Sequence, residues 1–262
     1  MKEDILVVKN LTKYVNNTKI LENVNFTMEK GKIYALVGKN GAGKTTLMKI
    51  LAGLSFQSSG SIQLFGYEGG LETARRWVGS LIENPAFYPY LTAKENLKLA
   101  QISHGILDEK EINEILKKMN FDYMNKKKVS NFSLGMKQKL GICMAMIHHP
   151  KLLILDEPTN GLDEESIIEL RNVLSELVQN KRISILVSSH TLEYLQPIID
   201  TYFYMDSGKI VETISKNEFE HRYKRKNDFK AYSMQPMIFQ EKPEKYLYQN
   251  RNVGQNLERD RR

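Results

Sequence analysis

A glycine-rich loop between an apolar run and a helical pattern constrains the fold of this chain more than any other feature. Residues 38–46 read Gly-Lys-Asn-Gly-Ala-Gly-Lys-Thr-Thr, which matches the pattern G-x-x-x-x-G-K-[ST]. The apolar run 33–37 precedes the loop and suits a buried strand, and residues 45–51 are apolar at helical spacing. Backbone N–H groups of such a loop wrap phosphate oxygens at the N-terminus of the helix. The sequence therefore predicts a strand, a phosphate-binding loop and a helix in this order.

Two side chains at the end of this loop have chemistry suited to a nucleotide. We expect the Lys44 ammonium to bridge the β- and γ-phosphates, and the Thr45 hydroxyl to ligate Mg²⁺. A helix-capping glycine turn is the alternative, and the strand and helix on either side argue against it. The predicted nucleotide contacts in the loop are Gly38, Lys39, Asn40, Gly41, Ala42, Gly43, Lys44, Thr45 and Thr46.

A pair of carboxylates ends a second apolar run. Residues 151–155 read Lys-Leu-Leu-Ile-Leu, and Asp156 and Glu157 follow directly. Adjacent side chains on a strand point to opposite faces, so the two acids can do different work. We expect Asp156 to hold Mg²⁺ through water, opposite Thr45, and Glu157 to polarise an attacking water. A helix-capping acid pair is the alternative for this run taken by itself.

The order of elements around the acid pair predicts a parallel sheet. Residues 151–155 and 183–188 are continuous apolar runs, which are typical of strands buried on both faces. Residues 164–180 form an amphipathic helical pattern between them. A strand, a helix and a strand in this order indicate an α/β fold with parallel strands.

Composition and charge narrow the class of protein. The chain has 262 residues and a net charge of +7. Residues 221–262 contain 11 Lys and Arg and 5 Asp and Glu, so most of the excess positive charge lies in this segment. We predict this basic tail to be poorly ordered, as a solvated appendix or a contact to anionic lipid or a partner. A nucleic-acid partner is disfavoured, because no aromatic and basic face accompanies the charge.

Cysteine usage and hydropathy indicate a cytoplasmic chain. Cys143 is the single cysteine, which excludes an intrachain disulfide and a cysteine-based zinc site. No run approaches the ~18 apolar residues that a membrane span needs. The acidic start of the chain does not fit a signal peptide. His148 and His149, next to Pro150, are expected to be capping or solvated and not metal ligands.

Further motifs, in a fixed order, resemble those of the ATP-binding cassette (ABC) ATPases. Residues 133–136 (Ser133, Leu134, Gly135 and Met136) resemble the family's signature Leu-Ser-Gly-Gly-Gln, with Ser133 and Gly135 kept. Residues 158–163 look like the family's D-loop, with Asp163 its namesake. His190, after an apolar strand, looks like the switch histidine, and Tyr14 like the aromatic that stacks on adenine. The resemblance covers about residues 4–215.

The resemblance implies an architecture and a reaction. It implies a P-loop ATPase core with a parallel sheet, an antiparallel β flank from the first strands, and a helical subdomain at about 90–150. The ATPase domain would span 1–220, followed by the tail 221–262. The family's signature completes the site of a second subunit, which implies a homodimer that hydrolyses Mg²⁺-bound ATP. The resemblance implies that Glu157, His190 and Lys44 are the catalytic residues.

One departure from the family pattern points to a subgroup. Glu83 stands where the family usually has glutamine, and glutamate accepts hydrogen bonds but donates none when ionised. It keeps the capacity to bind Mg²⁺ or the attacking water. The run Glu-Asn-Pro-Ala-Phe-Tyr-Pro over 83–89 resembles ATPases of bacterial exporters that protect against bacitracin-like and lantibiotic peptides. Phe87, Tyr88 and Tyr90 form a candidate docking surface, with a core role as the alternative for Phe87 and Tyr88.

The resemblance implies a transporter subunit at the inner face of the cell membrane. The permease would be a separate chain, and the cargo an antimicrobial peptide or drug. A soluble cassette protein, such as an iron–sulfur assembly factor, is the first alternative. A module that binds ATP without turnover is the second, and the presence of Lys44, Asp156, Glu157 and His190 argues against it.

Overall fold

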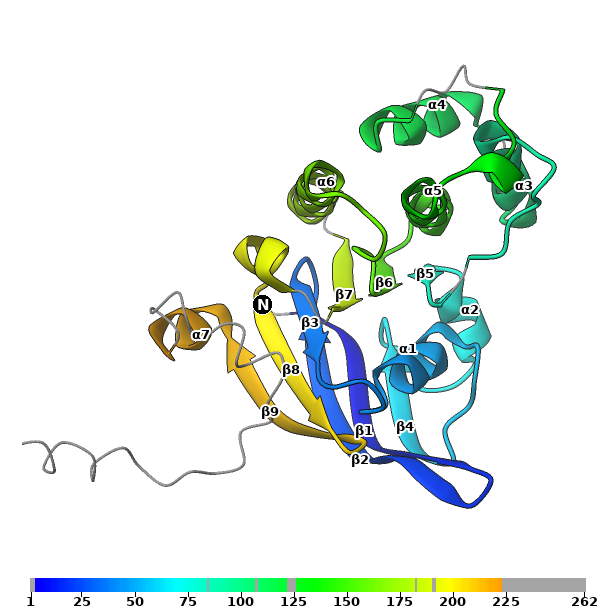
Figure 1. Ribbon diagram of the computed structural model, residues 1–262. Helices are drawn as coiled ribbons and strands as arrows, with labels where there is room; N and C mark the ends of the chain where they lie inside the picture. The colour runs from blue at the N-terminus through cyan, green and yellow to red at the C-terminus, as the bar shows by residue number, and fades with distance from the viewer. Residues whose placement is uncertain are drawn as a thin grey trace, which may run out of the picture.

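The computed structural model describes residues 3–83, 85–106, 108–121, 126–181, 183–189 and 192–222. Two sheets and a group of helices make up this part of the chain (Figure 1). The predicted α/β class with a mainly parallel sheet and an antiparallel flank is confirmed.

The larger sheet carries the candidate site at one end of its strands. Its six strands run in the order β5-β6-β7-β3-β8-β9, all parallel except β9, which pairs antiparallel with β8. Every residue of β3, β6 and β7 is buried, because the elements on both sides of the sheet cover these central strands. The strands are β3 (Ile33–Val37), β5 (Val78–Leu81), β6 (Leu152–Asp156), β7 (Ser184–Ser188), β8 (Thr201–Asp206) and β9 (Lys209–Ser215).

The smaller sheet is antiparallel and has the order β2-β1-β4, with β1 (Asp4–Val15), β2 (Thr18–Glu29) and β4 (Ser59–Leu64). Asn10 adopts a left-handed backbone with φ 51°, and the register shifts between Val8 and Leu11. This irregularity interrupts the alternation of buried and exposed residues by which a strand is recognised.

Three helices form the group at the upper right of Figure 1: α3 (Ala93–Ser103), α4 (Glu109–Lys118) and α5 (Leu134–Met146). Their N-termini are fixed by side-chain caps. Thr92 and Glu95 form a capping box at α3, Asp108 caps α4, and Ser133 caps α5. The remaining elements are α1 (Lys44–Ala52), α2 (Leu71–Arg75), α6 (Glu164–Lys181), α7 (Lys216–Arg222) and three short 3₁₀ turns, Val129–Asn131, Leu192–Tyr194 and Gln196–Ile198.

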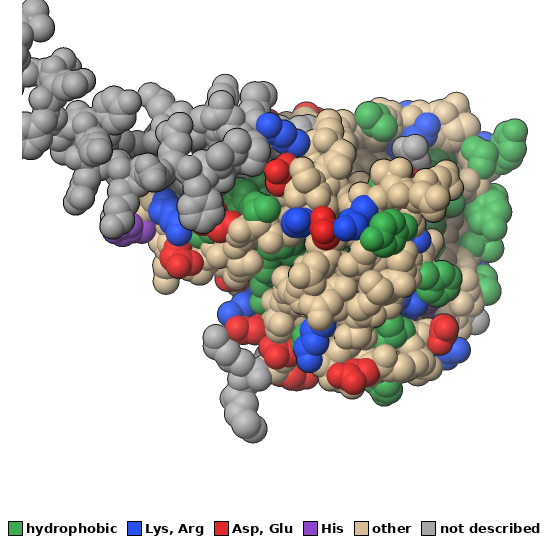
Figure 2. Space-filling model, turned by 90° about the horizontal axis from the view of Figure 1, so that it is seen from below, with side chains coloured by type: hydrophobic (Ala, Val, Ile, Leu, Met, Phe, Trp, Pro, Cys, Tyr) green, Lys and Arg blue, Asp and Glu red, His purple; other side chains and the backbone are tan. Residues whose placement is uncertain are grey.

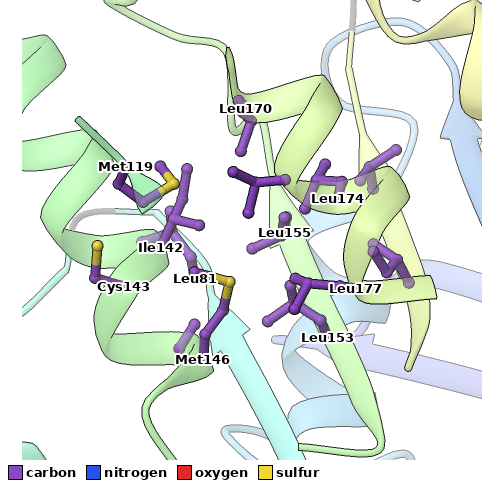
Figure 3. Close-up of a cluster of buried hydrophobic side chains, with 14 of the residues drawn as sticks. Leu81, Met119, Ile142, Cys143, Met146, Leu153, Leu155, Leu170, Leu174 and Leu177 are labelled. Atoms are coloured by element: carbon purple, nitrogen blue, oxygen red, sulfur yellow. The ribbon is translucent and has the colours of Figure 1, made fainter. Parts of the chain in front are cut away.

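Two buried clusters hold the layers together. One lies between the larger sheet and helices α5 and α6, where Leu153 and Leu155 of β6 face Leu174 of α6 and Ile142 of α5 (Figure 3). The other contains side chains of both sheets and of α1, including Leu47 and Phe203. The β6 strand, which ends at Asp156, is therefore packed on both faces, and this fixes the position of the acid pair.

Charges are interspersed over the surface. On the face shown in Figure 2, Lys and Arg side chains of the described residues lie among Asp and Glu, and hydrophobic side chains gather along one rim. In the part of the chain that the structure covers, no helix is long and apolar enough to span a bilayer. Helix α7 continues to Arg222, two residues beyond the expected end of the ATPase domain at 220. Residues 223–262 of the predicted tail lie outside the described residues.

The expectation that His148 is capping or solvated is wrong. Its side chain is buried, and its ring stacks on that of His104 with centroids 4.0 Å apart. His149 is half-exposed and lies 3.7 Å from Glu111. The packing of α5 against α3 buries His148, and spacing in the sequence does not reveal that contact.

Candidate functional site

The phosphate loop connects β3 to α1, as the motif predicts. Gly41 and Gly43 have φ values of 81° and 102°, which side chains rarely tolerate. A Cβ on Gly38 would lie 2.2 Å from the backbone oxygen of Met205. The glycines are therefore needed both for the turn of the loop and for its close contact with strand β8.

Lys44 lies inside this loop. Its Nζ donates hydrogen bonds to the carbonyl oxygens of Gly38 at 2.6 Å and Lys39 at 3.2 Å, and only 7% of the residue is exposed. The ammonium is thus held against the first two residues of the loop, close to the backbone groups predicted to surround phosphate. A charged donor in so confined a place suits recognition of an anion.

A second support for the loop was not predicted from the sequence. The N–H of Gly208, in the turn between β8 and β9, donates to the carbonyl of Ala42 at 3.0 Å. The Gly208 carbonyl in turn accepts from the N–H of Glu22 at 2.9 Å. Segments of β2 and of the β8–β9 turn, far apart in sequence, therefore fix the loop from behind.

The predicted metal ligands meet directly. The hydroxyl of Thr45 donates to Oδ2 of Asp156 at 2.7 Å. The hydroxyl of Ser188, at the end of the intervening strand β7, donates to Oδ1 of the same carboxylate at 2.5 Å. Asp156 is thus oriented from both sides, with its two oxygens assigned to different donors.

Glu157 follows Asp156 in a left-handed backbone conformation with φ 49°. Its N–H donates to the side-chain oxygen of Ser188 at 2.9 Å, and its carbonyl accepts from Gln138 Nε2 and from the N–H of Asn160, both at 3.1 Å. The chain therefore leaves the extended conformation of β6 directly after Asp156. Ser188 and Gln138 lie in segments examined in the sequence but were not predicted as site residues, because their roles depend on tertiary contacts.

Glu83 contacts helix α1. Its Oε1 accepts from Lys49 Nζ at 2.6 Å, and its backbone has φ 58°. Lys49 is one helical turn after Thr45, so Glu83 joins the end of β5 to the helix that starts at the phosphate loop. This ion pair is partly exposed, and its energetic contribution is correspondingly small.

The predicted signature and D-loop contact each other within this chain. Ser133 accepts a hydrogen bond from the N–H of Met136 at 3.2 Å, and Gly135 and Leu134 pack against Gly161. Asp163 precedes α6 and accepts from the N–H of Ser166 at 2.9 Å. The hydrogen bond with Ser166 holds the pKa of the Asp163 carboxyl below its usual range.

A cavity of about 400 Å³ lies beside these two segments, away from Lys44. Its walls combine apolar side chains such as Phe121 and Phe132 with the polar ends of Ser133, Lys139 and Asp163. Lys139 is paired with Glu169 of α6 at 2.9 Å, which closes this side of the helical group. The cavity is not where the phosphate loop binds its predicted ligand.

Tyr14 lies on the antiparallel flank of the fold. Tyr14 is 47% exposed on β1 and pairs with Lys19 of β2, next to Ile20, whose carbonyl would lie 3.2 Å from a Cβ on Gly43. Its ring is therefore on the same hairpin that contacts the phosphate loop. His190 lies outside the described residues.

A phosphate loop after one parallel strand, joined through a hydroxyl to a carboxylate at the end of the next strand but one in the sheet, defines a P-loop nucleoside-triphosphatase. Residues 21–160 match the ABC transporter family. The chain is 40% identical over 229 residues to the bacitracin transport ATP-binding protein BcrA of Enterococcus faecalis, covering 87% of this chain and 74% of that protein. It is 44% identical over 207 residues to the lantibiotic transport ATP-binding protein SrtF of Streptococcus pyogenes, covering 79% and 89%. The chain therefore belongs to the ABC transporter family, as an ATP-binding subunit.

Solved structures agree with this assignment. The ATP-binding subunit of an ABC transporter has a TM-score of 0.75 and 31% identity, covering 84% of this chain and 93% of that one. The dimeric cassette MJ0796 bound to ADP and Pi has the same TM-score of 0.75 at 23% identity, which supports the fold. The resemblance to ABC ATPases and to the bacitracin and lantibiotic subgroup is confirmed, and the soluble-factor alternative is not favoured.

Proposed function

We propose that this subunit hydrolyses ATP at the site built from Lys44, Thr45, Asp156 and Glu157, and that hydrolysis energises export of an antimicrobial peptide. The observation that carries the proposal is the hydrogen-bond chain from Thr45 through Asp156 and Ser188 to the backbone of Glu157. It ties the predicted phosphate loop to the predicted base across three strands.

The residues present fit Mg²⁺. Thr45 supplies a hydroxyl oxygen and Asp156 a carboxylate, which are the hard oxygen ligands that Mg²⁺ prefers, and phosphate and water complete its shell. Bound there, Mg²⁺ would neutralise charge on the phosphates. Lys44 would bind phosphate oxygens, and Glu157 would orient and deprotonate a water. His190 enters the proposal on sequence grounds, as a sensor of the γ-phosphate, and Tyr14 as the adenine contact.

The partners are a second copy of this chain and a separate membrane protein. In the proposed homodimer, residues 133–136 of one subunit face the nucleotide of the other, in a two-fold arrangement. Tyr88 and Tyr90 are 62% and 77% exposed, beside the helical group, and support docking of a permease there. Phe87 instead packs partly against the core. The subunit would then sit on the cytoplasmic side of the membrane.

The cargo is proposed from the relatives. BcrA and SrtF carry bacitracin and lantibiotic transport in their names, and both cover more than three quarters of this chain. The substrate itself would contact the permease, so this chain supplies the energy and not the selectivity. Self-protection against a peptide antibiotic is the function that fits both relatives.

A capture experiment tests the proposal. A tagged Glu157→Gln chain is expressed in its native cell, and membranes are solubilised gently with ATP. We expect a trapped dimer with little turnover and a multi-span membrane protein in matching amount. Glu165→Gln, on the exposed start of α6, is the matched control and should hydrolyse ATP normally. Recovery of a soluble partner, or full turnover in Glu157→Gln, would refute the transport role or the base, respectively.

A further inference from the structure

The start of α5 and the loop before α6 approach each other more closely than side chains would allow. A Cβ on Gly135 would lie 2.6 Å from the carbonyl oxygen of Gly161, and a Cβ on Gly161 would lie 2.6 Å from Cγ of Leu134. Each segment thus occupies the space that a side chain of the other would need. The two segments are interlocked, with Leu134 covering the bare side of Gly161.

The contact with Gly161 gives Leu134 a role within its own chain. Leu134 is the first residue of α5 and 63% exposed, so burial in the core does not select a large apolar side chain. Gly161 has φ 74°, and a Cβ at this position would meet the side chain of Leu134. An exposed leucine seated on a left-handed glycine limits the conformations open to that glycine.

The interlocked segments both hold the proposed base. Gln138, one turn along α5 from Leu134, donates to the carbonyl oxygen of Glu157 at 3.1 Å. Asn160, next to Gly161, donates its N–H to the same oxygen at 3.1 Å. Glu157 has a left-handed backbone, which is strained for a residue with a side chain and persists only where its surroundings impose it.

We infer that Leu134 is a positioning residue: by seating on Gly161, it holds residues 158–163 against α5 in the arrangement that fixes the backbone of Glu157. This inference rests on the proposed role of Glu157 in ATP hydrolysis. Leu134 acts on the base through the loop, whereas a single subunit binds ATP through its own phosphate loop. Its loss should therefore lower turnover and leave ATP affinity unchanged.

The first test is Leu134→Ala in the full chain. Alanine keeps the helix start intact. We expect kcat for ATP hydrolysis to fall about threefold to tenfold with KM for ATP unchanged. Binding of a fluorescent ATP analogue should also be unchanged, and Leu134→Met should restore most of the turnover. Leu54→Ala, at another leucine of similar exposure, is the control and should behave as wild type.

A double-variant cycle with Gly161→Ala separates the inferred contact from any other role of Leu134. The added methyl group takes the place of Leu134, so the contact is already lost in Gly161→Ala. We expect the double variant to turn over no more slowly than Gly161→Ala, a clear departure from additivity.

Three outcomes would overturn the inference: wild-type kcat in Leu134→Ala, weakened ATP binding, or multiplicative effects in the cycle. Multiplicative effects would place the contact of Leu134 outside its own chain. Failure of the proposed function looks different, since wild type would then lack ATPase activity or Glu157→Gln would retain it.

Discussion

The Thr45 hydroxyl lies 2.7 Å from a carboxylate oxygen of Asp156, although 111 residues separate the two in sequence. Thr45 is the second residue of α1, and Asp156 is the last residue of β6. Strand β7 pairs with both β3 and β6, and so sets the spacing between the phosphate loop and the acid pair. The contact joins the two motifs that define the nucleotide site.

Removing the Thr45 hydroxyl should lower Mg²⁺-dependent ATP turnover while the chain still folds. Thr45→Val keeps the shape of the side chain but leaves Asp156 Oδ2 without its donor. We expect kcat for Mg²⁺-ATP to fall by at least about tenfold, because a metal ligand is lost. Thr45→Ser keeps the hydroxyl and should remain active, as measured by phosphate release over a Mg²⁺ titration. Equal activity of the two variants would contradict the assignment of Thr45 as a ligand.

Ser188→Ala tests the link between the two carboxylates. The change removes the donor to Asp156 Oδ1 and one of the two acceptors of the Glu157 N–H, which keeps its contact of 3.2 Å with the backbone carbonyl of Ser188. An unsatisfied buried polar group costs about 1–3 kcal/mol, so we expect a lower free energy of unfolding and a lower kcat. Urea titration and ATPase assays measure both. Ser175→Ala, on helix α6, is the control. It should change the free energy of unfolding by no more than about 0.5 kcal/mol and leave kcat unchanged.

The sequence predicts the ligand-binding motifs of this site but not the residues that support them. The phosphate loop and acid pair were found because their chemistry needs fixed residue types at fixed short spacings. Ser188 and Gln138 act through tertiary contacts, and their importance depends on strand register and helix packing. The same reason explains the buried His148, which looked solvated until α3 was packed against it. Local patterns thus predict elements and ligand-binding loops, whereas partners across the fold require the structure.

Glu83→Gln probes the departure from the family pattern. The variant loses the ion pair with Lys49 but can still accept hydrogen bonds. We expect hydrolysis to persist and stability to change by less than about 1 kcal/mol, because the pair is partly exposed. Coupling to the permease should change, seen as a different stimulation of ATPase activity by the membrane partner. Lys49→Gln breaks the same pair from α1 and should alter stimulation similarly.

Complete loss of hydrolysis in Glu83→Gln would contradict a role for Glu83 in coupling alone. Glu83 would then act on the attacking water or on Mg²⁺ and not on communication between β5 and α1. Normal stimulation in both single variants would instead show that the ion pair has no role in coupling.

The stacked pair of histidines should make stability sensitive to acid. Burial, and then the neighbouring charge of His104, lower the pKa of His148 to about 4, despite its ring nitrogen contact with the carbonyl oxygen of Val78. The nearby ionisable groups also include His149 and, beyond it, Glu111. In the unfolded chain His148 titrates near its ordinary pKa of 6.5. The unfolded state therefore binds more protons between these two values, and stability falls as the pH is lowered through that window.

The contribution of His148 to the free energy of unfolding is complete above pH 6.5 and is lost progressively as the pH falls toward 4. After allowance for solvent screening, we expect the loss to be about 1–2 kcal/mol. Urea unfolding at a series of pH values measures it. His148→Phe keeps a planar ring against His104 and removes the titrating group, so its stability should vary less over the same range. His221→Phe, on the exposed α7, is the control and should keep the wild-type slope. An identical pH dependence in His148→Phe and wild type would show that other groups set the acid sensitivity.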